Sequence, residues 1–394
     1  MELSALISPV SLDQFVAEYF EKLPLHIMRE DSGYYSGLLT LNDLDSVLAR
    51  HLLRQADCRV TKQIKMVPPR EFLSTSSKGM EDVVDPTKIH ALIREGATII
   101  FEAAHRWHPP LNKLTNTIYR EWGHHSQCNV YLTPPGSYGF GPHYDTHDVI
   151  ILQVHGSKRW KLYDNRIELA LQSQAKTVTA LADEPSHELV LQQGDALYIP
   201  RGLVHDAETL DDTSAHITLG LLFYTWNEFL SDTINRAAHD NVALRKALPL
   251  GFLGKNPLST VNRQFLDGMV AAVRAQLELD LANSAVPEGY ASRAVPLHQK
   301  GLLLSAVSED VLTLDTKVEV REGKNFRVVN GEDSVILEGT GVQLSFPADV
   351  AEVITFVLDS STFVVNDIPE LDDESKLILA KRLIKEGCLA VAAR

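Results

Sequence analysis

Short runs of apolar residues, separated by tight-turn signals, dominate the middle of the chain. They are rich in β-branched and aromatic residues: NVYLT (129–133), HDVIILQV (147–154), KRWKLY (158–163), ALYIP (196–200) and HITLGLLFY (216–224). Glycine, proline and aspartate punctuate the chain between these runs, as in PPGSYGFGP, HGS, QGD and PRG. Many short strands joined by tight turns are typical of a β-barrel or a jelly roll. We therefore predict such a barrel in this part of the chain.

Helical patterns flank the predicted barrel on both sides. Residues 1–120 mix two amphipathic segments, SLDQFVAEYFEKL and LNDLDSVLARHLL, with extended pieces such as ATIIFEA, which predicts a helical layer attached to a sheet. Beyond Trp226 an apolar residue recurs at every fourth position: Phe265, Met269, Val273, Leu277 and Leu281. This spacing places the five side chains on one stripe of a single helix. Two interpretations stay open, packing on its own domain and an interface between two copies.

A polar stretch, residues 283–301, is the best candidate for a linker, and a small α/β module is predicted after it. Strands are expected first in this module, followed by one helix near the end of the chain. An acidic first turn, a basic last turn and a final glycine mark that helix: Asp372, Asp373, Glu374, Lys381, Arg382, Lys385 and Gly387. Charges of these signs stabilise the two ends of a helix, and glycine commonly follows its last turn.

The composition is that of a globular protein with room for two or three domains. Of the 394 residues, 44% are hydrophobic and 23% are charged, which is too apolar for a disordered chain. No apolar run approaches the roughly 20 residues of a membrane span, and the N-terminus lacks the pattern of an export signal. Cys58, Cys128 and Cys388 are far apart and odd in number, which disfavours a disulfide framework or a thiolate zinc site. We therefore expect a cytoplasmic protein with no membrane association.

The net charge limits the partners that the chain can bind. It is −15 at pH 7. Binding to nucleic acid or to an anionic membrane requires clustered Lys and Arg side chains that neutralise phosphates. The charge therefore argues against both of these partners, and a basic protein is easier to accommodate.

Three residues have the types and the spacing of a metal site. His143 and Asp145 stand two apart just before a predicted strand, and residues two apart on a strand share a face. An imidazole and a carboxylate side by side can chelate one cation, and a third ligand must come from elsewhere. His205, which follows the run 196–200 and the PRG turn, is the candidate. Two histidines and one carboxylate on one face of a metal leave three open positions, as in the non-heme Fe(II) oxygenases.

Other histidines are weighed against this set. His147 shares the face of His143 and Asp145 by the same two-residue period, so it is an alternative ligand or a hydrogen-bonded neighbour of the ligands. His216 opens a predicted strand, and a position in the core or beside the ligands is favoured over a fourth ligand. The remaining histidines near this region have no partner at a meaningful spacing, and we interpret them as structural or exposed: His105, His108, His124, His125 and His155.

Lys158 is a cation in a predicted strand that is otherwise built of large side chains, among them Trp160, Leu162 and Tyr163. An unpaired buried charge is very costly, so a lysine that points into a barrel requires an anion beside it. A co-substrate with two carboxylates would supply that anion.

With these residues in view, the chain resembles the JmjC-type cupin oxygenases, and among them the ribosomal oxygenase branch, which hydroxylates ribosomal proteins. Three segments carry the resemblance, residues 129–145, 149–163 and 194–210, and weaker similarity extends to EKLPLHI and DDESKLILAKRLI near the two ends. The resemblance therefore covers most of the chain in order. It implies an α+β fold built on a double-stranded β-helix, the cupin or JmjC jelly roll, with a helical N-terminal layer.

The resemblance also implies roles for four residues at the predicted site. His143, Asp145 and His205 match the Fe(II) ligands of the family, and Lys158 matches the basic residue that binds the distal carboxylate of 2-oxoglutarate. This second match agrees with the need of Lys158 for an anion.

Two further positions match the family less firmly, and one departs from it. Tyr131 and Asn129, on the strand that enters the site, match residues that face the co-substrate or the substrate. Gly220 stands where eukaryotic members carry a small hydroxyl residue near the substrate. The identity of the target side chain therefore stays open.

The family architecture implies three parts: a JmjC or cupin catalytic domain over 1–225, a helical dimerisation region over 226–300, and a winged-helix-like domain over 301–394. A homodimer is therefore expected. Winged helices often bind DNA, so the charge of the last part matters. It holds 17 acidic and 9 basic side chains, a net of −8. Direct binding of nucleic acid through this domain is not expected.

These observations together predict an Fe(II)- and 2-oxoglutarate-dependent dioxygenase that uses O₂ to hydroxylate a side chain, Arg or His, of a basic ribosomal protein. Two alternatives share this chemistry: a 2-oxoglutarate-dependent demethylase of N-methyl-lysine, and a hydroxylase of a small molecule or nucleoside. An alternative of another class is a non-catalytic cupin that binds metal or serves as a scaffold. A complete ligand set together with Lys158 favours catalysis, because a scaffold needs neither.

Overall fold

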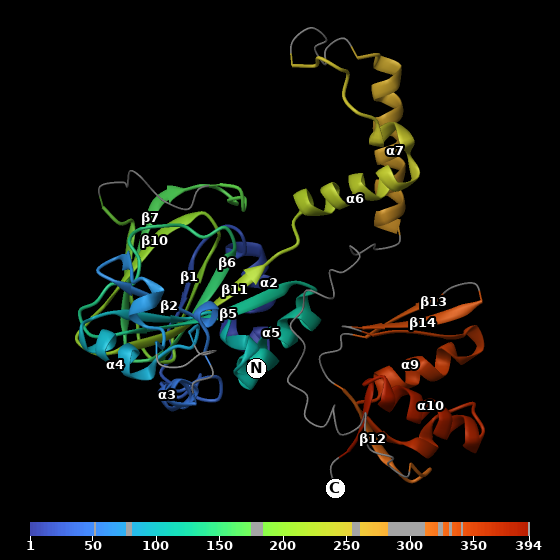
Figure 1. Ribbon diagram of the computed structural model, residues 1–394, viewed down its shortest axis with the longest axis horizontal. Coiled ribbons are helices and arrows are strands. Elements are labelled where there is room, and N and C mark those ends of the chain that lie inside the picture. Colours follow the sequence, from blue (N-terminus) through green and yellow to red (C-terminus); the bar gives the residue numbers. More distant parts are fainter. Residues whose placement is uncertain are drawn as a thin grey trace. The chain divides into compact units, whose positions relative to one another are not determined.

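The structure, a computed structural model, describes most of the chain (Figure 1). The described residues are 1–50, 53–75, 81–174, 184–253, 261–282, 312–321, 326–330, 333–339 and 342–392. The helices are α1 (Leu3–Ile7), α2 (Leu12–Gln14), α3 (Leu41–Ala49), α4 (Pro86–Arg94), α5 (Pro109–Trp122), α6 (Trp226–Asp240), α7 (Arg263–Ala282), α9 (Ala351–Asp359) and α10 (Asp373–Lys385). Among the helices of these segments, none is long and apolar enough to cross a membrane. The predicted linker 283–301, and with it the predicted boundary between residues 300 and 301, lies outside the described residues.

The strands carry most of the architecture. They are β1 (Leu25–Ile27), β2 (Cys58–Lys62), β3 (Lys65–Met66), β4 (Thr98–Phe101), β5 (His125–Thr133), β6 (Asp148–His155), β7 (Lys158–Arg166), β8 (His187–Leu191), β9 (Ala196–Ile199), β10 (Leu203–Thr209), β11 (Ser214–Leu222), β12 (Lys317–Val320), β13 (Arg327–Asn330), β14 (Ser334–Gly339), β15 (Val342–Pro347), β16 (Thr362–Val364) and β17 (Leu389–Val391). The five runs that predicted strands in the sequence correspond to β5, β6, β7, β9 and β11.

Two antiparallel sheets form the barrel. The larger sheet has eight strands in the order β1-β9-β6-β11-β5-β4-β2-β3, and the smaller has three in the order β10-β7-β8. After β6 the chain crosses to the smaller sheet for β7 and β8, returns for β9, crosses again for β10 and returns for β11. This alternation between two sheets is the connectivity of a jelly roll, as the sequence predicts.

An apolar cluster joins the inner faces of the two sheets. Successive residues of a strand point to opposite faces, so every second residue of these strands points between the sheets. The residues of the cluster come from β6, β7, β8 and β9: Val149, Ile151, Trp160, Leu162, Leu191, Leu197 and Ile199. Polar side chains that share these inward faces are therefore exceptional, and they mark the candidate site.

The N-terminal segment forms a helical layer on the larger sheet. Phe15 is fully buried, and its ring lies 4.9 Å from the ring of Tyr198 on β9 and 6.3 Å from that of Trp122 on α5. The amphipathic segment 11–23 forms the short helix α2, followed by a single π-helical turn, Phe15–Tyr19. The second predicted segment forms α3, which begins at a capping box made by Thr40 and Asp43. The predicted helical layer is therefore present, with a shorter first helix.

Residues Phe223–Arg293 form a compact unit of their own. In its described part, α6 begins at a capping box formed by Thr225 and Glu228, and it packs on α7. The predicted apolar stripe lies on α7. Its first four residues are half-buried, and Leu281 is exposed. Most of the stripe therefore packs within this unit.

The C-terminal module has a hydrophobic core that includes Val318, Val353, Leu383 and Leu389. Two three-stranded sheets, β16-β12-β17 and β13-β14-β15, contribute to this core together with α9 and α10. Helix α10 begins at Asp372, whose carboxylate accepts the N–H of Ser375 at 2.7 Å. The acidic first turn of this helix therefore lies where the sequence predicts it.

Candidate metal and co-substrate site

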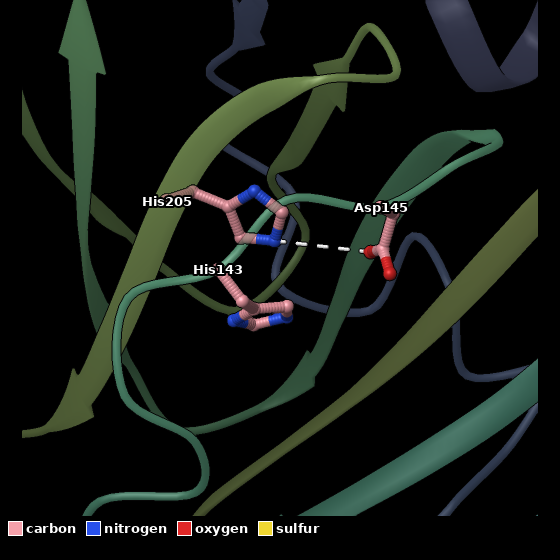
Figure 2. A group of neighbouring side chains, drawn as sticks. All are labelled: His143, Asp145 and His205. Atoms are coloured by element: carbon pink, nitrogen blue, oxygen red, sulfur yellow. Dashed lines mark ion pairs between the residues drawn. The ribbon is translucent and has the colours of Figure 1, made fainter. Parts of the chain in front are cut away.

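The three predicted metal ligands lie together in the barrel (Figure 2). His205 comes from β10, and His143 and Asp145 come from the segment that joins β5 to β6. One ligand atom from each residue lies within 4.8 Å of the others, and Nε2 of His205 is 3.9 Å from Oδ2 of Asp145. The structure thus brings together residues that are far apart in the sequence.

Cross-strand pairing with β10 positions His143. The sequence argument placed His143 and Asp145 on one face of a strand, whereas both precede β6. His143 and His205 form an isolated antiparallel pair, in which each N–H donates to the carbonyl of the other at 3.0 and 2.8 Å. Directly opposite residues of an antiparallel pair point to the same side, and the two ring centroids lie 4.6 Å apart.

Backbone hydrogen bonds fix which ring nitrogen of each histidine is available to a metal. Nδ1 of His143 lies 2.9 Å from the carbonyl oxygen of Gly141, and Nδ1 of His205 lies 2.9 Å from that of Leu203. A carbonyl oxygen only accepts, so each Nδ1 carries the proton and donates it. In the neutral form of each ring, Nε2 then carries the lone pair that a metal-binding histidine uses.

Burial keeps His205 in the neutral state that a ligand needs. Its side chain is almost fully buried, and this burial, together with the neighbouring His143, lowers the pKa of His205 to about 4. The carboxylate of Asp145 opposes the shift but does not outweigh it. At neutral pH the imidazole is therefore uncharged, and no proton has to leave before a cation binds.

Lys158 is buried in the barrel without a carboxylate partner. Its side chain is 2% exposed, and Nζ donates to Oγ1 of Thr133 at 3.1 Å. Among the residues that the structure describes, no carboxylate lies within ion-pair distance of Nζ, and burial lowers the pKa of Lys158 to about 7. The next residue, Arg159, points to the other face of the strand, where it pairs with Glu188 at 3.0 Å and Glu208 at 2.9 Å.

Other unsatisfied polar atoms surround Lys158. Nε1 of Trp160, Oγ1 of Thr209 and Nδ1 of His216 are buried and have no hydrogen-bond partner among the described residues. Thr209 lies directly opposite Lys158 in the β10–β7 pairing, and the rings of Trp160 and His216 are 5.5 Å apart. Burial, with Lys158 nearby, holds the pKa of His216 well below its usual value. Because buried polar groups normally find partners, this cluster indicates a site for an anion with several oxygens.

Tyr131 contacts one of these unsatisfied groups, His216, and is close enough to Asp145 to interact with its charge. It stacks on His216 from the opposite position on β5, with ring centroids 4.8 Å apart and planes within 4° of parallel. Burial and then the charge of Asp145 raise the pKa of Tyr131, and its hydroxyl makes a hydrogen bond with Arg59. At neutral pH Tyr131 is therefore a neutral hydroxyl close to Asp145.

Asn129 makes a backbone contact in this structure. Its Oδ1 accepts the N–H of Ala103 at 2.9 Å. Ala103 has a φ of 46°, in the left-handed region that a residue with a Cβ adopts only at a cost. Asn129 therefore stabilises a strained turn at the end of β4, a role that the sequence did not suggest.

His147 lies against Gly220 on β11. A Cβ added to Gly220 would come within 2.8 Å of both Cδ2 and Nε2 of the His147 ring. Among the described residues, the group of ligand atoms within 4.8 Å of one another comprises His143, Asp145 and His205, and not His147. His147 is still close enough to contribute to the lowered pKa of His205. The departure at Gly220 thus makes room for a histidine beside the metal-ligand group.

Comparison with known families identifies the barrel. Residues 103–229 match the JmjC domain family. This part of the chain is therefore a JmjC domain. The chain is 30% identical to ribosomal oxygenase 2 of Rattus norvegicus over 307 residues, which cover 74% of this chain and 64% of that protein. The chain thus spans slightly less than two thirds of the length of this relative.

A second relative and a solved structure cover nearly the whole chain. The bifunctional lysine-specific demethylase and histidyl-hydroxylase NO66 of Dictyostelium discoideum is 25% identical over 429 residues, which cover 98% of this chain and 82% of that protein. YcfD, a ribosomal oxygenase from Escherichia coli solved with cobalt and 2-oxoglutarate, is similar at a TM-score of 0.53 and 18% identity, over 98% of this chain and 99% of that chain. The predicted resemblance to JmjC-type cupins and the predicted fold class are confirmed.

Sequence reasoning missed three polar groups of the JmjC domain that lie near Lys158. Trp160 is two residues after Lys158 on β7, and Thr209 is four residues after His205 on β10, so the two-residue period alone places both inward. Thr133, which accepts the hydrogen bond of Lys158, continues the inward row of Asn129 and Tyr131 on β5. Extending each row from its predicted site residue would have found all three.

Proposed function

We propose that this JmjC-domain protein is an Fe(II)- and 2-oxoglutarate-dependent dioxygenase that hydroxylates a side chain of a protein. The observation that carries the proposal is the combination, in one barrel, of the group His143, Asp145 and His205 with a buried Lys158 that has no carboxylate partner among the described residues. The relatives are named as oxygenases and as a histidyl-hydroxylase, which supports the same reaction class. A pure scaffold would not need a buried unpaired cation, because such a cation destabilises the fold.

The three clustered side chains would hold Fe(II). Their two imidazoles and one carboxylate fit a facial set of ligands, and three positions of the metal are left for other groups. When bound, the iron and 2-oxoglutarate together activate O₂ and supply the oxidising power for the hydroxylation. The chain contributes orientation: the carbonyls of Gly141 and Leu203 hold the two imidazole rings by their Nδ1–H groups.

The unsatisfied groups around Lys158 fit 2-oxoglutarate. Lys158 would bind the distal carboxylate by a charge-assisted contact, and Thr209, which lies opposite it, offers a hydroxyl donor. Nε1 of Trp160 is a further donor in the same region. YcfD, whose fold this chain shares, is solved with 2-oxoglutarate and a divalent metal. Tyr131, a neutral hydroxyl beside Asp145, we assign to the border between co-substrate and substrate, and Asn129 to the support of the adjoining turn.

The substrate that we propose is a basic ribosomal protein, with Arg or His as the target residue. The printed names of the relatives, ribosomal oxygenase and histidyl-hydroxylase, support this class. The net charge of −15 favours the approach of a basic partner over that of a nucleic acid. The name of the Dictyostelium relative also includes a lysine-specific demethylase, so demethylation is the second candidate function.

Mass spectrometry tests the proposed reaction directly. Ribosomal proteins from cells without the gene are incubated with the purified chain, Fe(II) and 2-oxoglutarate, and succinate is measured in parallel. We expect one protein to gain the mass of one oxygen atom, with one succinate formed for each hydroxylation, and the same modification to be present in cells that carry the gene. The Asp145→Ala variant is the control. Release of formaldehyde with loss of a methyl group would instead favour demethylation. Absence of turnover with every protein tested would contradict a protein substrate and favour a small-molecule hydroxylase or a non-catalytic scaffold.

We also propose that the chain forms a homodimer through α6. Trp226, Leu230 and Ile234 recur at every fourth position of this helix, and their side chains are 72, 42 and 47% exposed. An apolar helical stripe of this kind is normally covered in a soluble protein. Sedimentation velocity should give a dimer for the wild-type chain and a monomer for a Leu230→Asp, Ile234→Asp double variant. A wild-type monomer at micromolar concentration would contradict the proposal.

For the compartment and the excluded partners we keep the sequence-based expectations as proposals. Cys58, Cys128 and Cys388 are buried free thiols, which supports a reducing cytoplasm. The net charge of −8 over residues 301–394 disfavours binding of nucleic acid through the C-terminal module. Fluorescence anisotropy with labelled duplex DNA and ribosomal RNA fragments at low salt would test this second expectation.

A further inference from the structure

One buried carboxylate joins the two segments that carry the proposed metal ligands. Asp148 begins β6, three residues after Asp145, and its side chain is fully buried. It accepts three hydrogen bonds: from the N–H of Arg201 at 3.2 Å, from Nη1 of Arg201 at 2.9 Å, and from the hydroxyl of Tyr198. Arg201 lies in the turn between β9 and β10, four residues before His205. A single carboxylate therefore ties the segment of one ligand to the turn that precedes another.

A second contact joins the same two segments at the backbone. The N–H of Gly202, next to Arg201, donates to the carbonyl of Asp145 at 2.8 Å. Gly202 has a φ of +84°, and a Cβ at this position would lie 1.8 Å from the carbonyl oxygen of Ile167. Only glycine fits there, so the turn has one closely fixed position against the neighbouring chain.

The contacts extend to the N-terminal layer through Glu21. Its carboxylate accepts from Nη2 of Arg201 at 2.5 Å, and its own N–H donates to the hydroxyl of Tyr198 at 2.9 Å. Arg201 therefore bridges two carboxylates, one inside the barrel and one in the layer that covers it. The side chain of Glu21 is 34% exposed, so this end of the network lies closer to solvent than Asp148 does.

Stability alone is a weak reason for such a buried ion pair. Removing two charges from water costs about as much as their attraction returns, and apolar side chains of similar size often give an equally stable fold. What the pair does provide is direction, because one guanidinium nitrogen and one backbone N–H of Arg201 hold the turn at a defined distance and angle from β6, and a second guanidinium nitrogen binds Glu21. The elements held in this way are the ones that carry Asp145 and His205.

We infer that Asp148, Arg201 and Glu21 are positioning residues that set the geometry of the metal centre. The inference rests on the proposed function, since it requires that His143, Asp145 and His205 bind a metal. None of the three positioning residues belongs to the group of candidate ligands. Residues that orient metal ligands from outside typically change metal affinity by about 10- to 100-fold when they are replaced. Through the contact of Glu21 with Arg201, the N-terminal layer would also help to fix the geometry of the metal centre.

Titration with Co(II) followed by calorimetry tests the inference without any need for turnover. Asp148→Asn keeps the size of the side chain but removes the charge, and it should weaken Co(II) binding by about 10- to 100-fold. Arg201→Lys keeps the charge but cannot contact Asp148 and Glu21 together, so an intermediate loss is expected. Glu21→Gln should cost only about threefold, because it removes the more exposed charge and keeps a hydrogen-bond acceptor.

Asp280→Asn is the matched control. Asp280 is also an almost fully buried carboxylate bound by an arginine, Arg236, but it lies on α7 in the separate helical unit. This variant should lose stability and keep the Co(II) affinity of the wild type. At saturating Co(II), the visible absorption of the bound ion should change in Asp148→Asn and stay unchanged in Asp280→Asn, because only the first alters the ligand geometry.

The outcomes separate this inference from the proposed function. Wild-type Co(II) affinity and absorption in folded Asp148→Asn and Arg201→Lys would overturn the positioning role. If Asp148→Asn does not fold, Glu21→Gln decides in its place, and an affinity equal to that of the wild type would overturn the inference. Failure of the wild-type chain to bind Co(II), or no loss of affinity in His143→Ala, would overturn the metal centre itself.

Discussion

Two buried charges, one in the barrel and one in the helical unit, are equally inaccessible to solvent but differ in what surrounds them. Lys158 and Asp280 are each 2% exposed. Asp280 accepts hydrogen bonds from Thr233 at 2.8 Å, Arg236 at 2.6 Å and Gln276 at 2.7 Å. Burial alone would raise the pKa of Asp280, but these donors outweigh it and lower the pKa. Lys158 has one neutral partner, Thr133, and burial lowers its pKa to about 7.

This difference is the one expected between a structural charge and a charge that binds a ligand. Asp280 is paired within its own unit, so it needs nothing from outside and holds α6 to α7. Lys158 and the unsatisfied atoms near it keep a desolvation cost that no described residue offsets. Buried polar groups without a partner destabilise the free protein, and they are expected mainly at functional sites, where a ligand supplies the missing partner. The barrel therefore keeps buried polar groups that the proposed ligand would pair, whereas Asp280 in the helical unit is already paired with Arg236.

Loss of a metal ligand is expected to have the largest effect of the substitutions that follow. His143→Ala and Asp145→Ala should each lower kcat/KM for the protein substrate by more than about 10³-fold, because the cofactor chemistry depends on the metal. Both residues are only partly buried, so the variants should remain folded. Circular dichroism and thermal unfolding check the fold, and succinate formation checks the turnover.

Asp280→Ala is the control, because it leaves the barrel unchanged. It should unfold at a lower temperature and keep its specific activity. Normal turnover by both ligand variants would remove the site assignment.

Replacement of the two buried charges should change stability in opposite directions. Lys158→Met removes a buried amine that has no carboxylate partner among the described residues, so the free energy of unfolding should stay equal or rise. The KM for 2-oxoglutarate should rise by about 10- to 100-fold, the equivalent of a charge-assisted contact of roughly 1.5–3 kcal/mol. Asp280→Asn breaks an ion pair and should lower the free energy of unfolding by about 1–3 kcal/mol without any change in that KM. Urea unfolding and steady-state kinetics measure both quantities.

Two results would change this view of Lys158. An unchanged KM in Lys158→Met would mean that another cation binds the distal carboxylate. Arg159 is the nearest alternative along the chain, although its guanidinium is occupied by Glu188 and Glu208 on the other face of the strand. A large loss of stability in Lys158→Met would instead make Lys158 a structural residue like Asp280.

Much of this site follows from local patterns in the sequence. Short β-rich runs between turn signals predict β5, β6 and β7, and a lysine in a strand of large side chains predicts an anion beside Lys158. The group His143, Asp145 and His205 is also visible, because a histidine and an aspartate two residues apart before one predicted strand combine with a histidine after the PRG turn. The reason given for the proximity of His143 and Asp145 was incomplete. Their geometry depends on the pairing of His143 with His205. The register between two segments that are far apart in the chain cannot be predicted from the local sequence of either one.

The remaining features depend on long-range contacts. The segment 11–23 has a helical pattern, but Phe15 packs on Tyr198 and Trp122, and the regular α-helix ends before a π-helical turn. Tertiary packing overrides helix propensity at such a position. The contact of Glu21 with Arg201 joins residues 180 apart in the sequence, and no local period points to it. The sequence shows which residues are charged, but it does not predict which of them pair across long distances in the chain.

Proton uptake on binding of 2-oxoglutarate tests whether Lys158, unlike the paired Asp280, changes its charge when a ligand binds. With a pKa of about 7, Lys158 is only about one tenth protonated at pH 8 in the free protein, and a bound carboxylate would return it to the charged state. Binding of 2-oxoglutarate should therefore take up about 0.9 proton at pH 8 and about 0.1 at pH 6. Calorimetry of the Co(II)-loaded protein in buffers of different ionisation enthalpy measures this uptake. Lys158→Arg should show none, since arginine stays charged. Equal uptake at both pH values would show that Lys158 does not change its charge on binding.

The smallest of these effects is expected at Gly220, and it tests whether the barrel has separate sides for co-substrate and for protein substrate. A Cβ at this position would meet the ring of His147 at 2.8 Å and Cγ of Gln127 at 3.2 Å. Both contacts are with side chains, which can move, so Gly220→Ala should fold with a stability within about 1 kcal/mol of the wild type.

The expected result at Gly220 is selective. Displacement of His147 beside the proposed metal ligands should change kcat/KM for the protein substrate by about two- to tenfold, while the KM for 2-oxoglutarate, which we attribute to Lys158, should stay constant. Gly268→Ala on α7, where an added Cβ meets nothing within 4 Å, is the control, and it should stabilise the helix without any kinetic effect. A parallel rise in the KM for the protein substrate and the KM for 2-oxoglutarate would show that His147 and Lys158 line one shared region. The barrel would then have no separate sides for the co-substrate and the protein substrate.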